Sequence, residues 1–260
     1  MFNIKANGRT LSEYLIPKLL ILSMHSSAKI RAHAIASLFC FVPLGLCPAF
    51  SANINRITAC LFTRVSDEDP SVRSHVCRVL AAFLQHRPIE LTQNIATTAE
   101  HMLNLTQDCN SNVALQACEF WLVFAGTPDL ASDLRPFLGK VVPVLLGFLP
   151  YGENELRRLR SHDYAEVENN AYNDSEWNLR KSAAASLDMC AVRFGTDLLR
   201  IVLKPLWMKL RSEDWLEKES AILALGAIAE GADRFIIDQG WADEPVRQAV
   251  KMRLSRSYTL

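Results

Sequence analysis

The sequence predicts an all-α fold, a right-handed superhelical solenoid of about five antiparallel helix pairs. Three observations lead to this prediction. Apolar residues recur at three- and four-residue spacing, which is the period of a helix that buries one face. Polar turns separate the apolar segments, and the pattern of turn and helix returns at intervals of about 40 residues. A helical-hairpin repeat of this length predicts a HEAT-type solenoid.

Five segments share a polar turn followed by an apolar helix. These second helices are marked by one bulky apolar residue at an equivalent position: Leu38, Leu80, Trp121, Leu187 and Leu225. The interval between Trp121 and Leu187 is longer than the others, and an insertion of about 25 residues explains it. An apolar first helix precedes each turn, at 11–24, 54–65, 89–105, 134–149 and 198–210. Each repeat is therefore a pair of helices.

The Asp69-Pro70 dipeptide shows how a turn separates the two helices of a pair. Proline fixes its own φ at the first turn of a helix and disfavours helix in the residue before it. Either Asp67 or Asp69 can cap the new helix. Three other prolines recur in phase inside first helices, which predicts curvature built into the stack: Pro17, Pro143 and Pro205.

One pair cannot bury both of its apolar faces, so neighbouring pairs must stack and their second helices form a concave, partner-binding surface. We place HEAT repeats at 1–149 and 177–232, an inter-helix loop at 150–176 and a degenerate tail at 233–260. The first block holds three full pairs and the first helix of the fourth. Gly226 to Gly231 predicts the end of the last helix. Both ends look ragged, so we expect a segment of a longer array.

Charge and cysteine usage narrow the possible partners and compartments. Lys plus Arg equals Asp plus Glu, 28 against 28, so no global field draws the chain to nucleic acid or to a membrane surface. The seven cysteines are not spaced for a disulfide framework or a metal site, and Met1 to Thr10 lacks the pattern of a secretory signal. We expect an intracellular protein. The apolar stretch 32–50 is interrupted by Pro43, Gly45 and Pro48, which disfavours a membrane span.

The sequence contains no motif that predicts catalysis or a cofactor. No glycine-rich turn follows a strand, and no serine, cysteine or carboxylate lies in a nucleophile motif. The six histidines are scattered, and His33 and His75 occupy equivalent repeat positions, which favours structural or surface roles over metal ligation. We therefore expect a protein that binds other proteins and is not an enzyme.

The insertion, residues 151–176, is the one long non-repetitive segment. It is either a solvated connection or a long acidic loop that contacts the concave face or a basic partner. Its acidic residues, interspersed with arginines, are Glu153, Glu155, Asp163, Glu166, Glu168, Asp174 and Glu176.

Several segments resemble the transportin (karyopherin-β2) family of nuclear import receptors. They are Leu15-Ile-Pro-Lys-Leu19, His25-Ser-Ser-Ala-Lys-Ile-Arg-Ala-His33, Asn112-Val-Ala-Leu-Gln-Ala-Cys-Glu-Phe-Trp121, Trp177-Asn-Leu-Arg-Lys181 and Glu219-Ser-Ala-Ile-Leu-Ala-Leu-Gly-Ala-Ile-Ala-Glu-Gly231. The resemblance spans about residues 11 to 232 and places the chain in the middle of the family's N-terminal half.

The resemblance implies a carrier with three kinds of partner: cargo proteins with proline-tyrosine nuclear localisation signals, Ran-GTP, and phenylalanine-glycine nucleoporins. It implies work in the cytoplasm, in the nucleus and at the nuclear pore. In the family an acidic loop couples Ran binding to cargo release, and 151–176 falls at its position but is shorter and less acidic.

The resemblance also implies a cargo-signal site on the helix from Trp177 to Val192 and on the next repeat. The matching positions are Trp177, Ala184, Ala185, Asp188 and Leu223. Small alanines leave room for the signal, and Asp188 can pair with its arginine. The alternative is that the alanines pack helices closely and that Asp188 is a solvated charge. The alternative hypothesis for the whole chain is that it is a static HEAT scaffold, which organises a protein complex without transport activity.

Overall fold

The structure is a computed structural model that describes residues 5–6, 9–43, 48–160 and 177–238. It divides into two compact units, residues 1–134 and 135–260. Both are built from antiparallel helix pairs, as predicted. No helix within the described ranges combines the length and apolar character needed to cross a bilayer.

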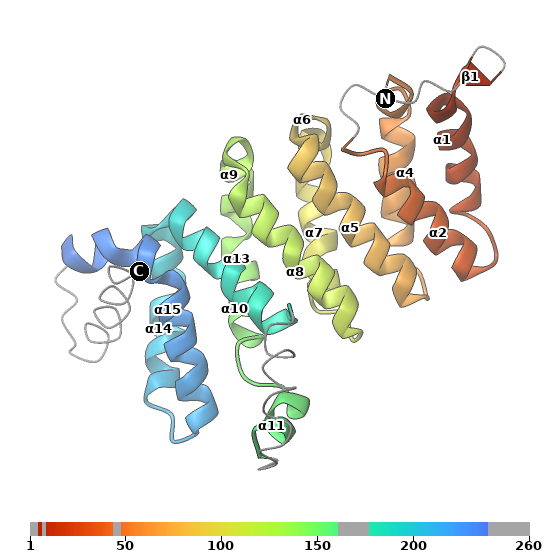
Figure 1. The fold of residues 1–260 in the computed structure, drawn as a ribbon. Helices are drawn as coiled ribbons and strands as arrows, with labels where there is room; N and C mark the ends of the chain where they lie inside the picture. The colour runs from red at the N-terminus through yellow and green to blue at the C-terminus, as the bar shows by residue number, and fades with distance from the viewer. Residues whose placement is uncertain (1–4, 7–8, 44–47, 161–176, 239–260) are drawn as a thin grey trace. The chain divides into compact units, whose positions relative to one another are not determined.

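The first unit contains three helix pairs in two layers (Figure 1). The first helices are α1 (Leu11–Leu22), α4 (Ile54–Arg64) and α7 (Ile95–Thr106). The second helices are α2 (Ala28–Phe39), α5 (Pro70–His86) and α8 (Ser111–Gly126). Helix α5 packs against both α2 and α8, so the second helices form a continuous layer.

Short elements complete the first unit. Strands β1 (Lys5–Ala6) and β2 (Arg9–Thr10) pair antiparallel, Lys5 opposite Thr10, and were not predicted because two residues are too short for an alternating pattern. The other short elements are helical: α3 (Pro48–Ser51), α6 (Pro88–Leu91), η1 (Thr92–Asn94), η2 (Pro128–Leu130) and α9 (Ala131–Leu134).

The second unit begins with the 3-10 turn η3 (Arg135–Phe137) and contains two further pairs. Its helices are α10 (Leu138–Gly147), α11 (Glu153–Arg160), α13 (Leu179–Phe194), α14 (Thr196–Leu210) and α15 (Trp215–Asp238). Helix α10 packs against α13 and α14, and α15 packs against α13 and α14. Gly195, at φ 42°, joins α13 directly to α14 in a backbone conformation that other residues rarely adopt.

The core of the first unit lies between its two layers. Trp121, Phe120 and Phe124 of α8 are fully buried, and Phe120 meets the Trp121 ring edge-on with centroids 5.2 Å apart. The indole Nε1 of Trp121 donates to Thr106 Oγ1 of α7 at 2.8 Å. This contact satisfies the buried N–H and ties the first helix of the pair to the second.

Three predicted boundaries are wrong. The expected helix 89–105 is divided into α6, η1 and α7, because Thr92 and Asn94 have low helix propensity. The expected helix 134–149 begins only at Leu138, because Pro136 disfavours helix in the residue before it and lies in the 3-10 turn η3, which precedes α10. Helix α15 continues through Gly226 and Gly231 to Asp238. Each glycine costs about 1 kcal/mol of helix stability, and the packing of α15 against α13 and α14 offsets this cost.

The prolines expected inside first helices do lie there: Pro17 in α1, Pro143 in α10 and Pro205 in α14. At the Asp69-Pro70 turn, Asp69 is the residue that caps α5, because its carboxylate accepts the N–H groups of Ser71 and Val72. Asp67 has a different role, described below.

Candidate binding surface

Helix α13 presents one side to the core and the other away from it. Ser182, Ala183, Ser186, Leu187 and Cys190 are buried. The predicted site residues of this helix, Ala184, Ala185 and Asp188, are half-buried and lie on the opposite stripe, at helical spacing. The structure therefore places all three on one outward-facing surface.

Helix α15 continues this surface in the second unit. Ser220, Ala221 and Ala224 face the core, whereas Leu223 is half-buried and Ile222 is more than half exposed. Because α13 and α15 pack side by side, Leu223 lies on the helix next to the one that carries Asp188. An apolar side chain and a carboxylate thus lie on adjacent second helices.

Two tryptophans lie near the start of these helices. Trp177 precedes α13 and Trp215 opens α15, and both are about half exposed. The guanidinium of Arg180 lies 3.7 Å from the centroid of the Tyr151 ring, and the Tyr151 and Trp215 rings are 6.4 Å apart. Arg180 also pairs with Glu219 and donates from Nε to the carbonyl of Leu149 at 2.6 Å. This arginine therefore joins the end of α10, α13 and α15.

The first part of the acidic insertion is a helix, α11, where a loop was expected. The carboxylate of Glu155 accepts the N–H of Gly152 at 2.8 Å and the side-chain amide of Asn178 at 3.4 Å. Acidic residues in the first turn favour a helix here, because they interact well with its N-terminal dipole. Glu153 makes an exposed pair with Arg157. The other predicted acids, Asp163, Glu166, Glu168, Asp174 and Glu176, lie outside the described residues.

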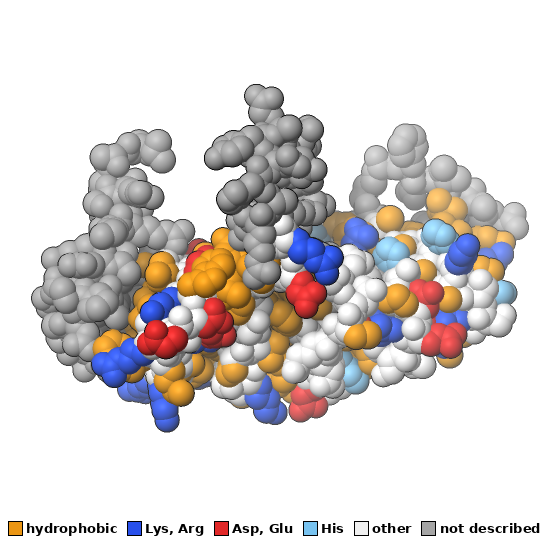
Figure 2. Space-filling model, turned by 90° about the horizontal axis from the view of Figure 1, so that it is seen from below, with side chains coloured by type: hydrophobic (Ala, Val, Ile, Leu, Met, Phe, Trp, Pro, Cys, Tyr) orange, Lys and Arg blue, Asp and Glu red, His pale blue; other side chains and the backbone are white. Residues whose placement is uncertain are grey.

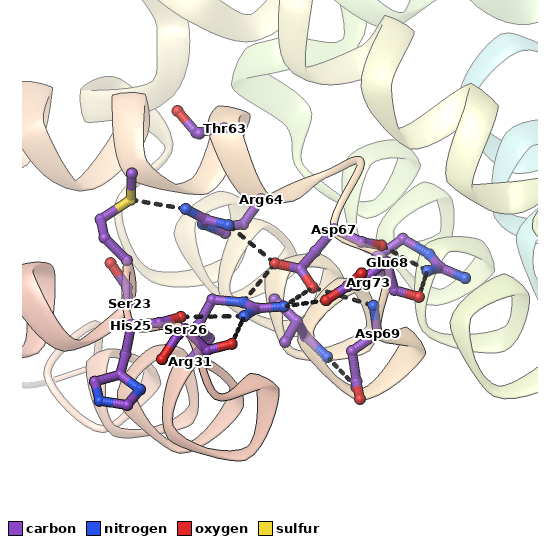
Figure 3. A network of polar contacts seen from close by, with 12 residues as sticks. Ser23, His25, Ser26, Arg31, Thr63, Arg64, Asp67, Glu68, Asp69 and Arg73 are labelled. Atoms are coloured by element: carbon purple, nitrogen blue, oxygen red, sulfur yellow. Dashed lines mark hydrogen bonds and ion pairs between the residues drawn. The ribbon is translucent and has the colours of Figure 1, made fainter.

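A ladder of buried and partly buried ion pairs links successive repeats, and it was not predicted. Arg31 of α2 donates from Nε and Nη2 to the carboxylate of Asp67 at 2.8 and 2.7 Å, and from Nη1 to the carbonyls of its own turn (Figure 3). Arg64 also reaches Asp67, at 3.1 Å. Asp67 thus connects the first pair of helices to the second.

Arg73 of α5 has the same geometry in the next repeat. It donates from Nε and Nη2 to Asp108 at 2.7 and 2.9 Å, and from Nη1 to the carbonyls of Asp67 and Glu68. The hydrogen bonds from Arg73 hold the pKa of the Asp108 carboxyl below its usual value. In the sequence an arginine follows a branched apolar residue in the first turn of these helices, in Ile30-Arg31 and Val72-Arg73. This recurrence was the signal that sequence reasoning did not use.

The described residues contain no group of three or more His, Cys, Asp or Glu side chains arranged to hold a metal ion. His75 is half-buried, and burial, the charge of Arg78 and the charge of His33 all lower its pKa.

On the face drawn in Figure 2, charges of both signs are interspersed with hydrophobic side chains. The arrangement suits binding of a polypeptide surface.

Comparison with curated proteins finds relatives that match most of this chain. No family model matches the chain. The chain is 33% identical to importin subunit beta-2 of Schizosaccharomyces pombe in a match that covers 86% of this chain and 30% of that protein. It is 35% identical to transportin-1 of Mus musculus over 84% of this chain and 28% of that protein. The chain therefore spans less than a third of the length of these relatives.

Solved structures confirm the fold class. Importin beta has a TM-score of 0.71 at 18% identity, covering 94% of this chain and 30% of that chain. Kap95p bound to RanGDP has a TM-score of 0.67 at 19% identity, covering 86% and 27%. At these identities the likeness concerns the fold alone. The names of the relatives are those of transport proteins, in agreement with the expectation that the chain is not an enzyme.

Proposed function

Because the chain is a homologue of the transportin (importin β-2) proteins of nuclear import over most of its length, we propose that it binds nuclear localisation signals of cargo proteins. The signal would lie as an extended segment across α13 and α15. The observation that carries this proposal is the outward stripe formed by Ala184, Ala185 and Asp188.

The chemistry of this stripe matches an extended basic segment with a proline-tyrosine end. Alanine side chains let a peptide backbone approach the helix closely, and the carboxylate of Asp188 pairs with arginine or lysine. Leu223 supplies an apolar contact. Packed helices lie about 10 Å apart and an extended chain rises about 3.3 Å per residue, so a peptide reaches from α13 to α15 in about three residues.

A binding measurement with matched charge reversals tests the proposal. A fluorescently labelled proline-tyrosine signal peptide is titrated with the chain, with its Asp188→Lys variant and with Glu213→Lys, which reverses an exposed carboxylate in the turn before α15. We expect Asp188→Lys to weaken binding about tenfold and Glu213→Lys to change it less than about twofold. Equal affinities of the two variants would remove Asp188 from the site.

A steric variant examines the alanines independently of charge. Ala184→Gln keeps helix propensity and adds bulk to the outward stripe. The expected result is weaker binding with unchanged helicity by circular dichroism. Unchanged affinity would mean that the signal does not approach this part of α13.

The further partners of a transport receptor belong to the same proposal. Kap95p, which shares the fold, binds Ran. We propose that Ran-GTP and phenylalanine-glycine nucleoporins bind this chain too, and that it works in the cytoplasm, in the nucleus and at the nuclear pore. In this proposal the insertion from α11 onward, with the acids from Glu153 to Glu176, couples Ran binding to cargo release. A static HEAT scaffold is the competing function, and it predicts a complex that is insensitive to Ran-GTP.

A further inference from the structure

The second helices α2 and α5 of the first unit carry basic residues and no acidic ones. Neither 28–39 nor 70–86 contains Asp or Glu, although acids and bases balance over the whole chain. Arg31 and Arg73 are paired within the ladder. The exposed cations and histidines of these two helices are Lys29, His33, Arg78 and His86, and His75 is half-buried beside them. The outward side of α2 and α5 is therefore locally basic.

A polar groove lies next to this basic surface, between α5 and α8. It is open to solvent and has a volume of about 470 Å³. Ser71, His75 and Arg78 line it from α5, and Asn112 and Gln116 line it from α8. Asn112 Nδ2 donates to Ser74 Oγ at 3.1 Å across the groove. Amide and hydroxyl side chains of this kind can both donate to and accept from a peptide main chain.

The cations are held in place at the α5 edge of the groove. The Arg78 guanidinium lies 5.1 Å from the centroid of the Phe39 ring of α2, so its stem crosses from one second helix toward the other. His75 is close enough to Arg78 and His33 for their charges to act on it. Glu119, on the α8 side, is the carboxylate in the groove lining. The charge of the lining is thus divided, with cations toward α2 and α5.

These features define the ligand by its chemistry. Carboxylates would pair with the Arg78 guanidinium and accept hydrogen bonds from the imidazoles of His75 and His33, while the main chain would meet the amides of Asn112 and Gln116. An extended chain rises about 3.3 Å per residue and second helices are about 10 Å apart, so acidic residues about three positions apart would meet successive helices. We propose that this groove, with the adjoining side of α2 and α5, binds an extended acidic peptide segment of a partner protein.

A peptide fits this surface better than a nucleic acid. Nucleic-acid binding relies on several cations that follow a phosphate backbone and on a field of one sign. Here the chain has no net charge, and the groove holds Glu119 and neutral amides beside its cations. A peptide main chain also offers N–H donors to the amide oxygens of Asn112 and Gln116, and a phosphate backbone has no such donor.

Fluorescence anisotropy with the whole chain tests the proposal. The probe is a labelled peptide of about ten residues with glutamate at every third position and serine elsewhere, at low ionic strength. The charge-reversal variant is Arg78→Glu. Its control is Arg56→Glu, which reverses another exposed arginine, on the first helix α4 of the same unit. A lysine-serine peptide and a single-stranded oligonucleotide of equal charge are the comparison ligands.

We expect saturable binding of the acidic peptide, about tenfold weaker for Arg78→Glu and within about twofold for Arg56→Glu. A third variant, Gln116→Ala, is expected to weaken binding without altering net charge. The proposal is overturned if the acidic peptide does not bind, if both arginine variants behave alike, or if the oligonucleotide binds more tightly than the peptide. Circular dichroism of each variant verifies that the helices remain folded.

Discussion

Removing the carboxylate of Asp108 should destabilise the first unit far more than removing an exposed carboxylate. Asp108 accepts two hydrogen bonds from Arg73 and one from the N–H of Asn110, and the two paired side chains are 9% and 14% exposed. Breaking a fully buried ion pair costs about 3–5 kcal/mol, and exposed pairs contribute about 0–1 kcal/mol. This pair is mostly but not fully buried, so we expect Asp108→Ala to cost about 2–3 kcal/mol.

Amide hydrogen exchange followed by mass spectrometry measures this cost locally. A loss of about 2–3 kcal/mol corresponds to roughly 30- to 150-fold faster exchange in α5, α7 and α8. The matched control is Glu153→Ala, whose partner Arg157 is 3.6 Å away and whose side chains are 75% and 89% exposed. We expect the control to cost less than about 0.5 kcal/mol. Equal effects of the two substitutions would refute the assignment of a stabilising ladder.

Three further predictions follow from particular contacts. Thr106→Val leaves the buried Trp121 N–H without its acceptor, and it should lower the free energy of unfolding measured in urea by about 1–3 kcal/mol. The control Thr63→Val, on the exposed side of α4, should lower it by less than about 0.5 kcal/mol. Similar losses for the two variants would contradict the role of this hydrogen bond. A thiol reagent should label the exposed Cys40 and Cys109 in the native protein. It should reach the buried cysteines only after unfolding, and burial also raises the pKa of two of them, Cys60 and Cys77; the buried set is Cys60, Cys77, Cys118 and Cys190. Rapid labelling of Cys77 in the native protein would show that the core is open. The pKa of Asp108 is lower in the folded chain than in the unfolded one, so its stabilisation is complete above the unfolded value of about 3.9 and is lost as pH falls through the folded value. The difference in urea midpoint between the native chain and Asp108→Asn should therefore be constant from about pH 7 to 5 and shrink below about pH 4, and a constant difference down to pH 2 would count against it.

The helix pairs were predictable because their signal is local. Leu38, Leu80 and Leu187 recur in phase, and each lies fully buried in the second helix expected to hold it. Boundaries were less predictable, because they depend on contacts outside the segment. The low helix propensity of Gly226 predicts that the helix ends there, yet α15 continues past it because α13 and α14 pack against that helix. Pro136 is the local signal in the sequence for the late start of α10.

The residues of the candidate site come from the family resemblance, and their role in binding stays a prediction. The structure places Ala184, Ala185 and Asp188 on the side of α13 that faces away from the core. The link from Arg180 to Tyr151, Glu219 and Leu149 joins residues far apart in sequence, so no local pattern reveals it. For the pairing of Arg73 with Asp108 the sequence shows only the recurring arginine, because the carboxylate partner lies in the next repeat and is identified only when the repeats are stacked.

The response of a bound signal peptide to Ran separates a transport receptor from a static scaffold. A labelled proline-tyrosine peptide is bound to the chain and titrated with Ran carrying a non-hydrolysable GTP analogue, with Ran-GDP as the control. A receptor of the transportin kind should release the peptide with the GTP form and not with the GDP form, which lowers the anisotropy. A peptide that stays bound at saturating Ran-GTP, or that never binds, would contradict the account.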